Sequence, residues 1–221
     1  MFKDKDCIKL ADEIYVFKKY IPEDMLNKYT TLLDQYQPEE FREENETQEW
    51  YRDHVSPQTL ELIDLWEHVS ELIYPEYYIN PQTQVLASRP GQAGMFVHCD
   101  SPGKGRADLL TQEDTYCTCA LIDYGVVAYL SNFTGGEIIY PNIGVTYKPE
   151  AGDVVIHSAF TPYEHGTLPV LSGVRYAFSC FATHKDDLPG TFYAYKSPEY
   201  LNKVKDRSIE SLKNWANGTE F

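Results

Sequence analysis

Residues 129–176 have the sequence YLSNFTGGEIIYPNIGVTYKPEAGDVVIHSAFTPYEHGTLPVLSGVRY, in which short apolar segments alternate with turn-forming residues. Turn signals such as Gly135-Gly136 and Pro141-Asn142 separate these segments. Short segments that are rich in β-branched and aromatic residues and bounded by glycine or proline are typical of strands. This stretch therefore predicts a β-rich core, in which the two adjacent glycines form a tight hairpin turn with positive φ angles.

Helical patterns lie on both sides of the strand-rich region. Apolar residues recur at helical spacing in three segments, 22–38, 56–75 and 197–215. Each segment has a proline close to its start, where a missing backbone N–H costs nothing. Ile14–Phe17 is expected to form a short strand, and the polar segment Glu39–Asp53 an exposed loop or a frayed helix.

This order of elements predicts an α+β protein built around a double-sheet jelly roll. The pattern by itself is compatible with any two-sheet β-sandwich. A chain of 221 residues is long enough for one buried core, so we expect a single domain over residues 1–221. Within it we assign 1–80 to mainly helical support, 81–195 to the jelly-roll core and 196–221 to a C-terminal helix.

The composition excludes some classes of partner. A formal net charge of −15 argues against a surface that binds nucleic acid, which needs clustered lysine and arginine. No apolar run is long enough to cross a membrane, and the charged N-terminus lacks the apolar region of a signal peptide. The five cysteines show no disulfide spacing. We therefore expect a soluble cytoplasmic protein with reduced thiols and neither a nucleic-acid nor a membrane partner.

Two histidines and one aspartate form a candidate metal site. In an extended segment, side chains two residues apart point to the same side, so His98 and Asp100 converge while Cys99 points elsewhere. A third ligand must come from a distant strand, and both His157 and His165 are candidates. Two imidazoles and one carboxylate on one face of an ion are typical of non-haem Fe(II) oxygenases.

A series of motifs extends from Ser88 to Tyr176. These motifs are Ser88-Arg89-Pro90-Gly91-Gln92, His98-Cys99-Asp100, Tyr129-Leu130-Ser131-Asn132, Gly135-Gly136-Glu137, Tyr140-Pro141, Gly144, Pro149, Gly152-Asp153, His165-Gly166-Thr167-Leu168-Pro169-Val170 and Gly173-Val174-Arg175-Tyr176. Their order and spacing resemble the 2-oxoglutarate/Fe(II)-dependent dioxygenases, specifically the prolyl 4-hydroxylase-like branch. An isolated His-x-Asp triplet is common by chance, whereas its combination with the other motifs is specific.

The resemblance implies a double-stranded β-helix, or jelly roll, with two N-terminal helices against one sheet. It also implies that His98, Asp100 and His165 are the catalytic residues and the ligands of Fe(II). Arg175 would bind the far carboxylate of the co-substrate 2-oxoglutarate, and Tyr129 would touch the same molecule. O2 is the other co-substrate, and ascorbate is a further candidate cofactor.

Three positions depart from the family pattern. Arg175 stands where prolyl 4-hydroxylases often carry lysine, so the charge is kept and the donor geometry changes. Ser88 stands about where related enzymes often carry a tyrosine, which leaves part of the co-substrate pocket unassigned. His157 lies where the family usually carries a bulky apolar residue. We interpret it as a structural histidine in the sheet or at its rim, and His165 as the metal ligand.

The resemblance implies an enzyme that hydroxylates an unactivated C–H bond. The first candidate substrate is a prolyl residue in a peptide or protein, and the alternative is a free amino acid or another small molecule. A nucleobase substrate is disfavoured by the negative net charge. A cupin-like metal-binding module without turnover is the alternative from a different class, and Arg175 argues against it because such a module needs no co-substrate clamp.

Overall fold

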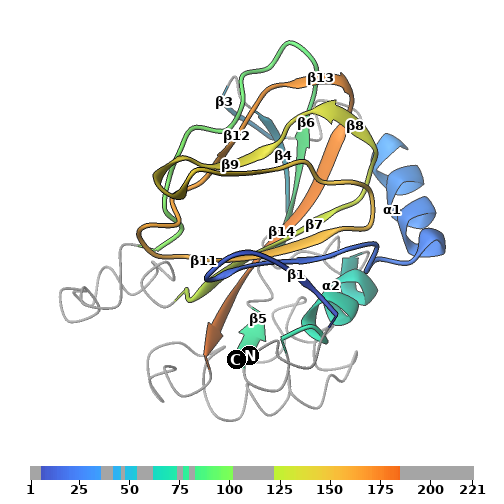
Figure 1. Cartoon of the computed structure of the whole chain (residues 1–221). Coiled ribbons are helices and arrows are strands. Elements are labelled where there is room, and N and C mark those ends of the chain that lie inside the picture. The colour runs from blue at the N-terminus through green and yellow to red at the C-terminus, as the bar shows by residue number, and fades with distance from the viewer. Residues whose placement is uncertain are drawn as a thin grey trace, which may run out of the picture.

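The computed structural model describes residues 6–35, 42–45, 48–53, 62–73, 77–79, 83–101 and 122–184 (Figure 1). Its helices are α1 (Glu23–Gln35) and α2 (Ile63–Ser70), and a short 3-10 turn spans Pro141–Ile143. The expected C-terminal helix lies outside the described residues. No described helix is long and apolar enough to span a bilayer.

The larger of the sheets has nine strands, which pair antiparallel. Their order is β1 (Ile8–Ala11), β2 (Ile14–Phe17), β11 (Val154–Ser158), β7 (Tyr124–Tyr129), β14 (Arg175–His184), β6 (Thr83–Ser88), β4 (Gln48–Asp53) and β3 (Arg42–Asn45), with β5 (Tyr77–Ile79) also paired to β14. Strands adjacent in the sheet are mostly distant in the chain, so the sheet is complete only when the N-terminal strands meet β11 and β6.

A smaller layer of strands faces the large sheet (Figure 1). It consists of the sheet β10 (Val145–Tyr147), β9 (Ile138–Tyr140) and β12 (Gly166–Thr167), and of the pair β13 (Val170–Gly173) and β8 (Phe133–Gly135). An isolated antiparallel bridge joins His98 to His165 just before β12. Two antiparallel layers with helices against one of them confirm the predicted α+β jelly roll.

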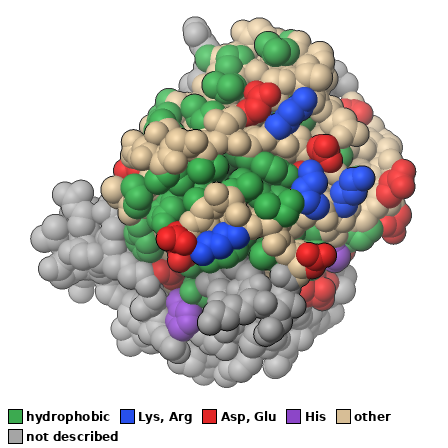
Figure 2. Space-filling view, viewed as in Figure 1, with side chains coloured by type: hydrophobic (Ala, Val, Ile, Leu, Met, Phe, Trp, Pro, Cys, Tyr) green, Lys and Arg blue, Asp and Glu red, His purple; other side chains and the backbone are tan. Residues whose placement is uncertain are grey.

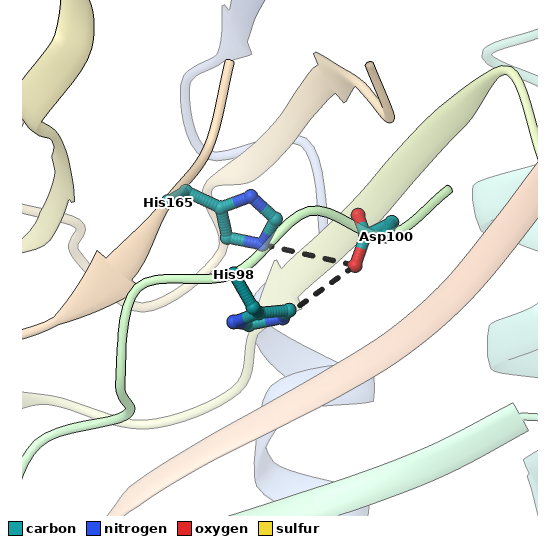
Figure 3. A group of neighbouring side chains, drawn as sticks. All are labelled: His98, Asp100 and His165. Atoms are coloured by element: carbon teal, nitrogen blue, oxygen red, sulfur yellow. Dashed lines mark ion pairs between the residues drawn. The ribbon is translucent and has the colours of Figure 1, made fainter. Parts of the chain in front are cut away.

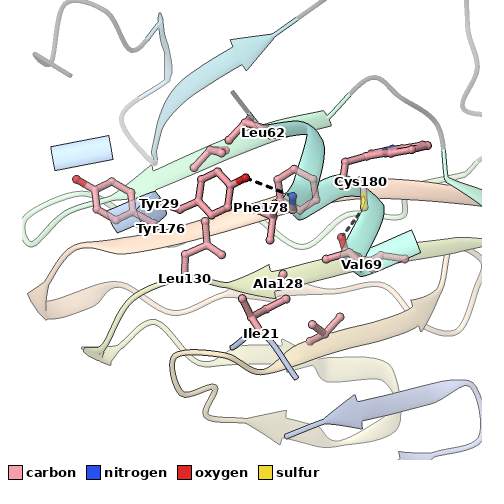
Figure 4. Close-up of a cluster of buried hydrophobic side chains, with 14 of the residues drawn as sticks. Ile21, Tyr29, Leu62, Val69, Ala128, Leu130, Tyr176, Phe178 and Cys180 are labelled. Atoms are coloured by element: carbon pink, nitrogen blue, oxygen red, sulfur yellow. Dashed lines mark hydrogen bonds between the residues drawn. The ribbon is translucent and has the colours of Figure 1, made fainter. Parts of the chain in front are cut away.

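Side chains along the central strands alternate between two hydrophobic cores, as the pleat of a strand requires. Ala128, Phe178 and Cys180 face the helices and pack in one core (Figure 4). Residues of the opposite parity, such as Tyr129 and Ala177, belong to a second core between the two layers of strands. The alternation determines which polar residues of the same strands point into the space between the layers.

Helices α1 and α2 cover the outer face of the large sheet (Figure 1). Tyr29 and Leu33, one turn apart on α1, are fully buried, as are Leu65 and Val69 on α2. The Tyr29 hydroxyl donates a hydrogen bond to Asp64 Oδ1 at 2.9 Å and therefore links the two helices. The helical patterns of the sequence correctly predicted both elements within the described residues.

Two local expectations were wrong. The segment Glu39–Asp53 was expected to be a loop or a frayed helix, yet its described residues form β3 and β4, which extend the edge of the large sheet. Region 1–80 accordingly contributes five strands besides its helices. Gly135 and Gly136 do have positive φ angles of 71° and 65°, but they connect strands of two different sheets instead of closing a hairpin.

Candidate active site

His98, Asp100 and His165 lie together between the two layers of strands (Figure 3). Their ligand atoms are all within 4.8 Å of one another. Asp100 Oδ1 is 3.6 Å from His98 Nε2 and 3.9 Å from His165 Nε2. The bridge between the two histidines holds their backbones in register through paired hydrogen bonds of 2.9 Å, so the distant third residue reaches the other two.

The outer ring nitrogens of both histidines face backbone carbonyls. His98 Nδ1 is 2.9 Å from the Phe96 oxygen, and His165 Nδ1 is 3.3 Å from the Tyr163 oxygen. A carbonyl oxygen can only accept, so each Nδ1 carries a proton and each Nε2 is the ring nitrogen that faces Asp100. Cys99 Sγ instead lies 2.9 Å from the Ala159 oxygen, which confirms that this side chain points away from the cluster.

The ionisation states suit a cation-binding site. Burial by itself would raise the pKa of Asp100, but contacts from His157 and His98 outweigh burial and hold that pKa well below its usual range. Burial, together with the nearby His157, lowers the pKa of His165 to about 3. Asp100 raises the pKa of His98 through a hydrogen bond. The carboxylate is therefore ionised and His165 is neutral, as metal ligands must be.

Arg175 is buried in the same space without a carboxylate partner among the described residues. Its Nη2 donates to Ser88 Oγ at 2.8 Å and its Nη1 donates to the Gly136 oxygen at 3.3 Å, whereas Nε has no hydrogen-bond partner. Burial lowers the pKa of Arg175, but an arginine remains protonated in proteins. A buried guanidinium that lacks a counter-ion is a site for an anion.

Arg175 and the predicted Tyr129 line the same cavity as the three candidate metal ligands, His98, Asp100 and His165. The volume of this cavity is about 310 Å³. Burial raises the pKa of Tyr129 to about 12, so its hydroxyl is neutral. Ser88, which stands where relatives often carry a tyrosine, instead orients the guanidinium.

His157 does not lie at the rim of the sheet. It is almost fully buried on β11, its Nε2 is 3.3 Å from Asp100 Oδ2, and its ring centroid is 4.0 Å from that of His165. Tyr140, also buried, places its hydroxyl 2.6 Å from His157 Nδ1. Alternation along β11 is the signal that could have predicted this position, since Val154 and Ile156 face the helices and His157 has the opposite parity.

Several exposed apolar residues are sequence neighbours of residues that line the cavity. Figure 2 shows hydrophobic side chains gathered in the middle of the face viewed. Phe96 and Val97, which precede His98, are 63% and 46% exposed, and Leu168, which follows the cavity-lining Thr167, is 41% exposed. Exposed apolar side chains thus flank two of the segments that line the cavity.

Neither a family model nor a curated protein matches the sequence. Solved structures share its fold. The collagen prolyl hydroxylase of Paramecium Bursaria Chlorella virus-1, in a 2OG complex, has a TM-score of 0.57 at 14% identity over 79% of this chain and 97% of its own. A Trichoplax adhaerens prolyl hydroxylase, in complex with a peptide of hypoxia inducible factor, has a TM-score of 0.60 at 16% identity over 80% and 86%.

A structure named for a different reaction is also similar. The alpha-ketoglutarate-dependent carbocyclase SnoK of nogalamycin biosynthesis has a TM-score of 0.55 at 12% identity, covering 78% of this chain and 80% of its own. One fold thus serves both hydroxylation and ring closure among these neighbours. The chain therefore has the fold of the 2-oxoglutarate/Fe(II) oxygenases, a group in which its structural neighbours include prolyl hydroxylases.

Proposed function

We propose that the protein is an Fe(II)- and 2-oxoglutarate-dependent oxygenase that hydroxylates an unactivated C–H bond, most readily that of a prolyl residue in a peptide or protein. One observation carries the proposal. A buried arginine with no counter-ion among the described residues shares a cavity with a cluster of two histidines and one aspartate. A metal site alone would not need this positive charge.

The donor set fits the metal. His98, Asp100 and His165 would hold Fe(II), because two imidazoles and one carboxylate are the ligands that non-haem oxygenases use and they leave coordination positions open. When bound, the iron and 2-oxoglutarate together would supply the oxidising power for cleavage of a C–H bond, with O2 as the oxidant.

The other cavity residues would bind and orient the co-substrate. Arg175 presents its unpaired Nε in the cavity wall, and Ser88 together with the Gly136 carbonyl fixes the plane of the guanidinium. A planar guanidinium can engage a carboxylate through two parallel hydrogen bonds. Tyr129, which is neutral and buried beside Arg175, would contact the same carboxylate. Burial of Arg175 excludes water and would therefore strengthen the attraction between its guanidinium and the bound carboxylate.

Two structural neighbours and the exposed apolar side chains of this chain support a peptide substrate. The Trichoplax relative is in complex with a peptide, and the viral relative is a collagen prolyl hydroxylase. The exposed apolar side chains next to cavity-lining residues in this chain suit an uncharged, partly apolar segment such as a proline-containing peptide. SnoK, a carbocyclase of nogalamycin biosynthesis, supports the alternative, a small molecule as substrate.

Substrate-stimulated succinate formation would test the proposal. The protein is incubated with Fe(II), 2-oxoglutarate and ascorbate, and either proline-rich peptides or free amino acids are added. We expect succinate to rise with the peptides, together with a product heavier by one oxygen atom. A response to free amino acids alone would replace the peptide by a small molecule and leave the reaction class intact.

A different measurement distinguishes the proposed oxygenase from a cupin-like metal-binding module without turnover. Fe(II) and 2-oxoglutarate are added in the absence of oxygen, and the visible spectrum is recorded. A weak charge-transfer band is expected for a co-substrate that chelates the iron. Metal binding without this band, and without succinate in air, would contradict the oxygenase and favour the binding module.

A further inference from the structure

His157 is a buried polar residue that the proposed chemistry does not use. It lies on β11 and points between the two layers of strands, where its Nε2 is 3.3 Å from Asp100 Oδ2. The three candidate ligands do not include it. The contact is not a well-aligned hydrogen bond, yet both atoms are buried and neither has another partner. Among the described residues, the 3.3 Å contact therefore brings together two buried polar atoms that have no hydrogen-bond partner elsewhere.

Tyr140 determines which ring nitrogen of His157 can donate a hydrogen bond to Asp100. The ring nitrogen of His157 that faces Asp100 Oδ2 is Nε2, 3.3 Å away, and a carboxylate oxygen accepts hydrogen bonds, so Nε2–H is the donor of this contact. Nδ1 is then an acceptor, and the Tyr140 hydroxyl, 2.6 Å away, donates to it. Tyr140 and His157 are both almost fully buried. Tyr140 thus selects the tautomer of His157 that can donate to Asp100.

Gly125 on β7 provides the space for this contact. It stands directly opposite His157 in the antiparallel pair of β7 and β11. A Cβ atom at Gly125 would lie 2.3 Å from His157 Nε2 and 2.6 Å from Asp100 Oδ2, closer than real Cβ atoms approach other atoms. A side chain at this position would push the two groups apart.

We infer that His157 is a positioning residue that orients Asp100 for metal binding, with Tyr140 and Gly125 as its supports; this inference rests on the proposed iron site. Metal ligands in proteins are held by outer partners, and loss of such a partner costs affinity. His98 and His165 have the carbonyls of Phe96 and Tyr163 in this role. His157 holds Oδ2 of the carboxylate, which leaves Oδ1 facing the two ligand imidazoles.

The affinity of the apoprotein for Mn(II) tests the inference without turnover, because free Mn(II) can be followed by its EPR signal. In H157F a ring of similar size cannot donate to Asp100, and we expect Mn(II) to bind about 10–100-fold more weakly. H157Q keeps an N–H donor near the position of Nε2 and should recover most of the loss. G125A should weaken binding as well, because the new methyl group displaces the contact.

Tyr140→Phe and Tyr29→Phe form a matched pair of variants. Both tyrosines are fully buried and hydrogen-bonded through the hydroxyl, Tyr140 to His157 and Tyr29 to Asp64. Y140F should weaken Mn(II) binding, by less than H157F does, because the donating ring remains. Y29F should lower thermal stability only. A purely structural role for Tyr140 predicts equal Mn(II) affinities for the two variants.

The outcomes separate three explanations. If the wild-type protein binds no Mn(II), the proposed metal site itself fails. Wild-type affinity in H157F overturns the positioning role and leaves the metal site standing. If His157 is instead a ligand, pulsed EPR of bound Mn(II) should show one imidazole fewer in H157F than in the wild type, and H157Q should not recover. We expect the same two imidazoles, from His98 and His165, in both proteins.

Discussion

At the scale of single residues, Arg175 is the most informative side chain of the site. It is 3% exposed, and its described partners are a hydroxyl and a carbonyl, neither of which carries a charge. Burying a cation without a counter-ion is costly. A bound anion that pairs with the guanidinium would offset this cost. A dicarboxylate bound to a metal in the same cavity would do so.

We therefore expect Arg175→Ala to weaken binding of 2-oxoglutarate strongly. Removing one partner of a buried charge pair costs about 3–5 kcal/mol, which corresponds to roughly two to three and a half orders of magnitude in affinity. Arg175→Lys should be milder, because the charge survives while the forked geometry is lost. The apparent constant for 2-oxoglutarate measures both. An unchanged constant in the alanine variant would remove Arg175 from the co-substrate site.

The three candidate ligands give a second prediction at this scale. His98→Ala, Asp100→Ala or His165→Ala should each abolish Fe(II) binding, since two remaining side chains hold the ion poorly. His68→Ala is a suitable control, because His68 lies on α2 with its Nε2 against the Tyr20 carbonyl, away from the cavity. Metal content after anaerobic reconstitution measures the effect. Full iron occupancy in any one of the three ligand variants would contradict the assignment.

At the scale of elements, a buried carboxylate joins β2 to the turn that precedes β11. Asp153 is fully buried, accepts hydrogen bonds from Tyr147 and from the backbone of Lys19 and Glu150, and forms an ion pair with Lys18 at 2.8 Å. Burial by itself would raise its pKa, but these partners outweigh burial and lower it. The bonds hold β2 against the strand that carries His157.

Asp153→Asn should destabilise the fold by about 1–3 kcal/mol at neutral pH, because an amide nitrogen would meet groups that donate to the carboxylate. Since the pKa of Asp153 is lower in the folded state, its stabilisation is present above the unfolded pKa, which is about 4, and disappears as the pH falls through the folded value. Urea unfolding at several pH values measures this difference. A difference between wild type and variant that stays constant down to acid pH would contradict the role of the charge.

At the scale of the whole molecule, the site lies between two layers that meet only in the folded chain. Ligands that bind this arrangement should stabilise the fold by mass action, by about 2.7 kcal/mol at a concentration one hundred times the dissociation constant. We expect Mn(II) to raise the melting temperature of the apoprotein, and 2-oxoglutarate to raise it further only when the metal is present.

The same melting experiment separates the two binding functions. Asp100→Ala should respond to neither ligand, whereas Arg175→Ala should respond to Mn(II) and lose the additional effect of 2-oxoglutarate. A chelator such as EDTA should reverse the shift in the wild-type protein. Stabilisation by 2-oxoglutarate without metal would show that the co-substrate binds independently of the cluster and would contradict a shared site.

Local patterns in the sequence determined much of this architecture. Helical spacing predicted α1 and α2, because each helix must bury one stripe of apolar residues. Short apolar segments between turn residues predicted the strands of the jelly roll. The spacing of four residues resembles that of known oxygenases and therefore identified them as site residues: His98, Asp100, His165 and Arg175. The structure brings all four to one cavity.

Only the tertiary structure decided how distant residues meet. Strands β3 and β4 could not be predicted from a polar, glutamate-rich segment, because β4 pairs with β6, thirty or more residues further along the chain, and β3 joins the sheet only through β4. His157 likewise gains its role from Asp100, Tyr140 and Gly125, which lie on separate segments. Sequence periodicity specifies which face of an element is buried, whereas the neighbours across that face depend on long-range strand pairing, which leaves no local pattern.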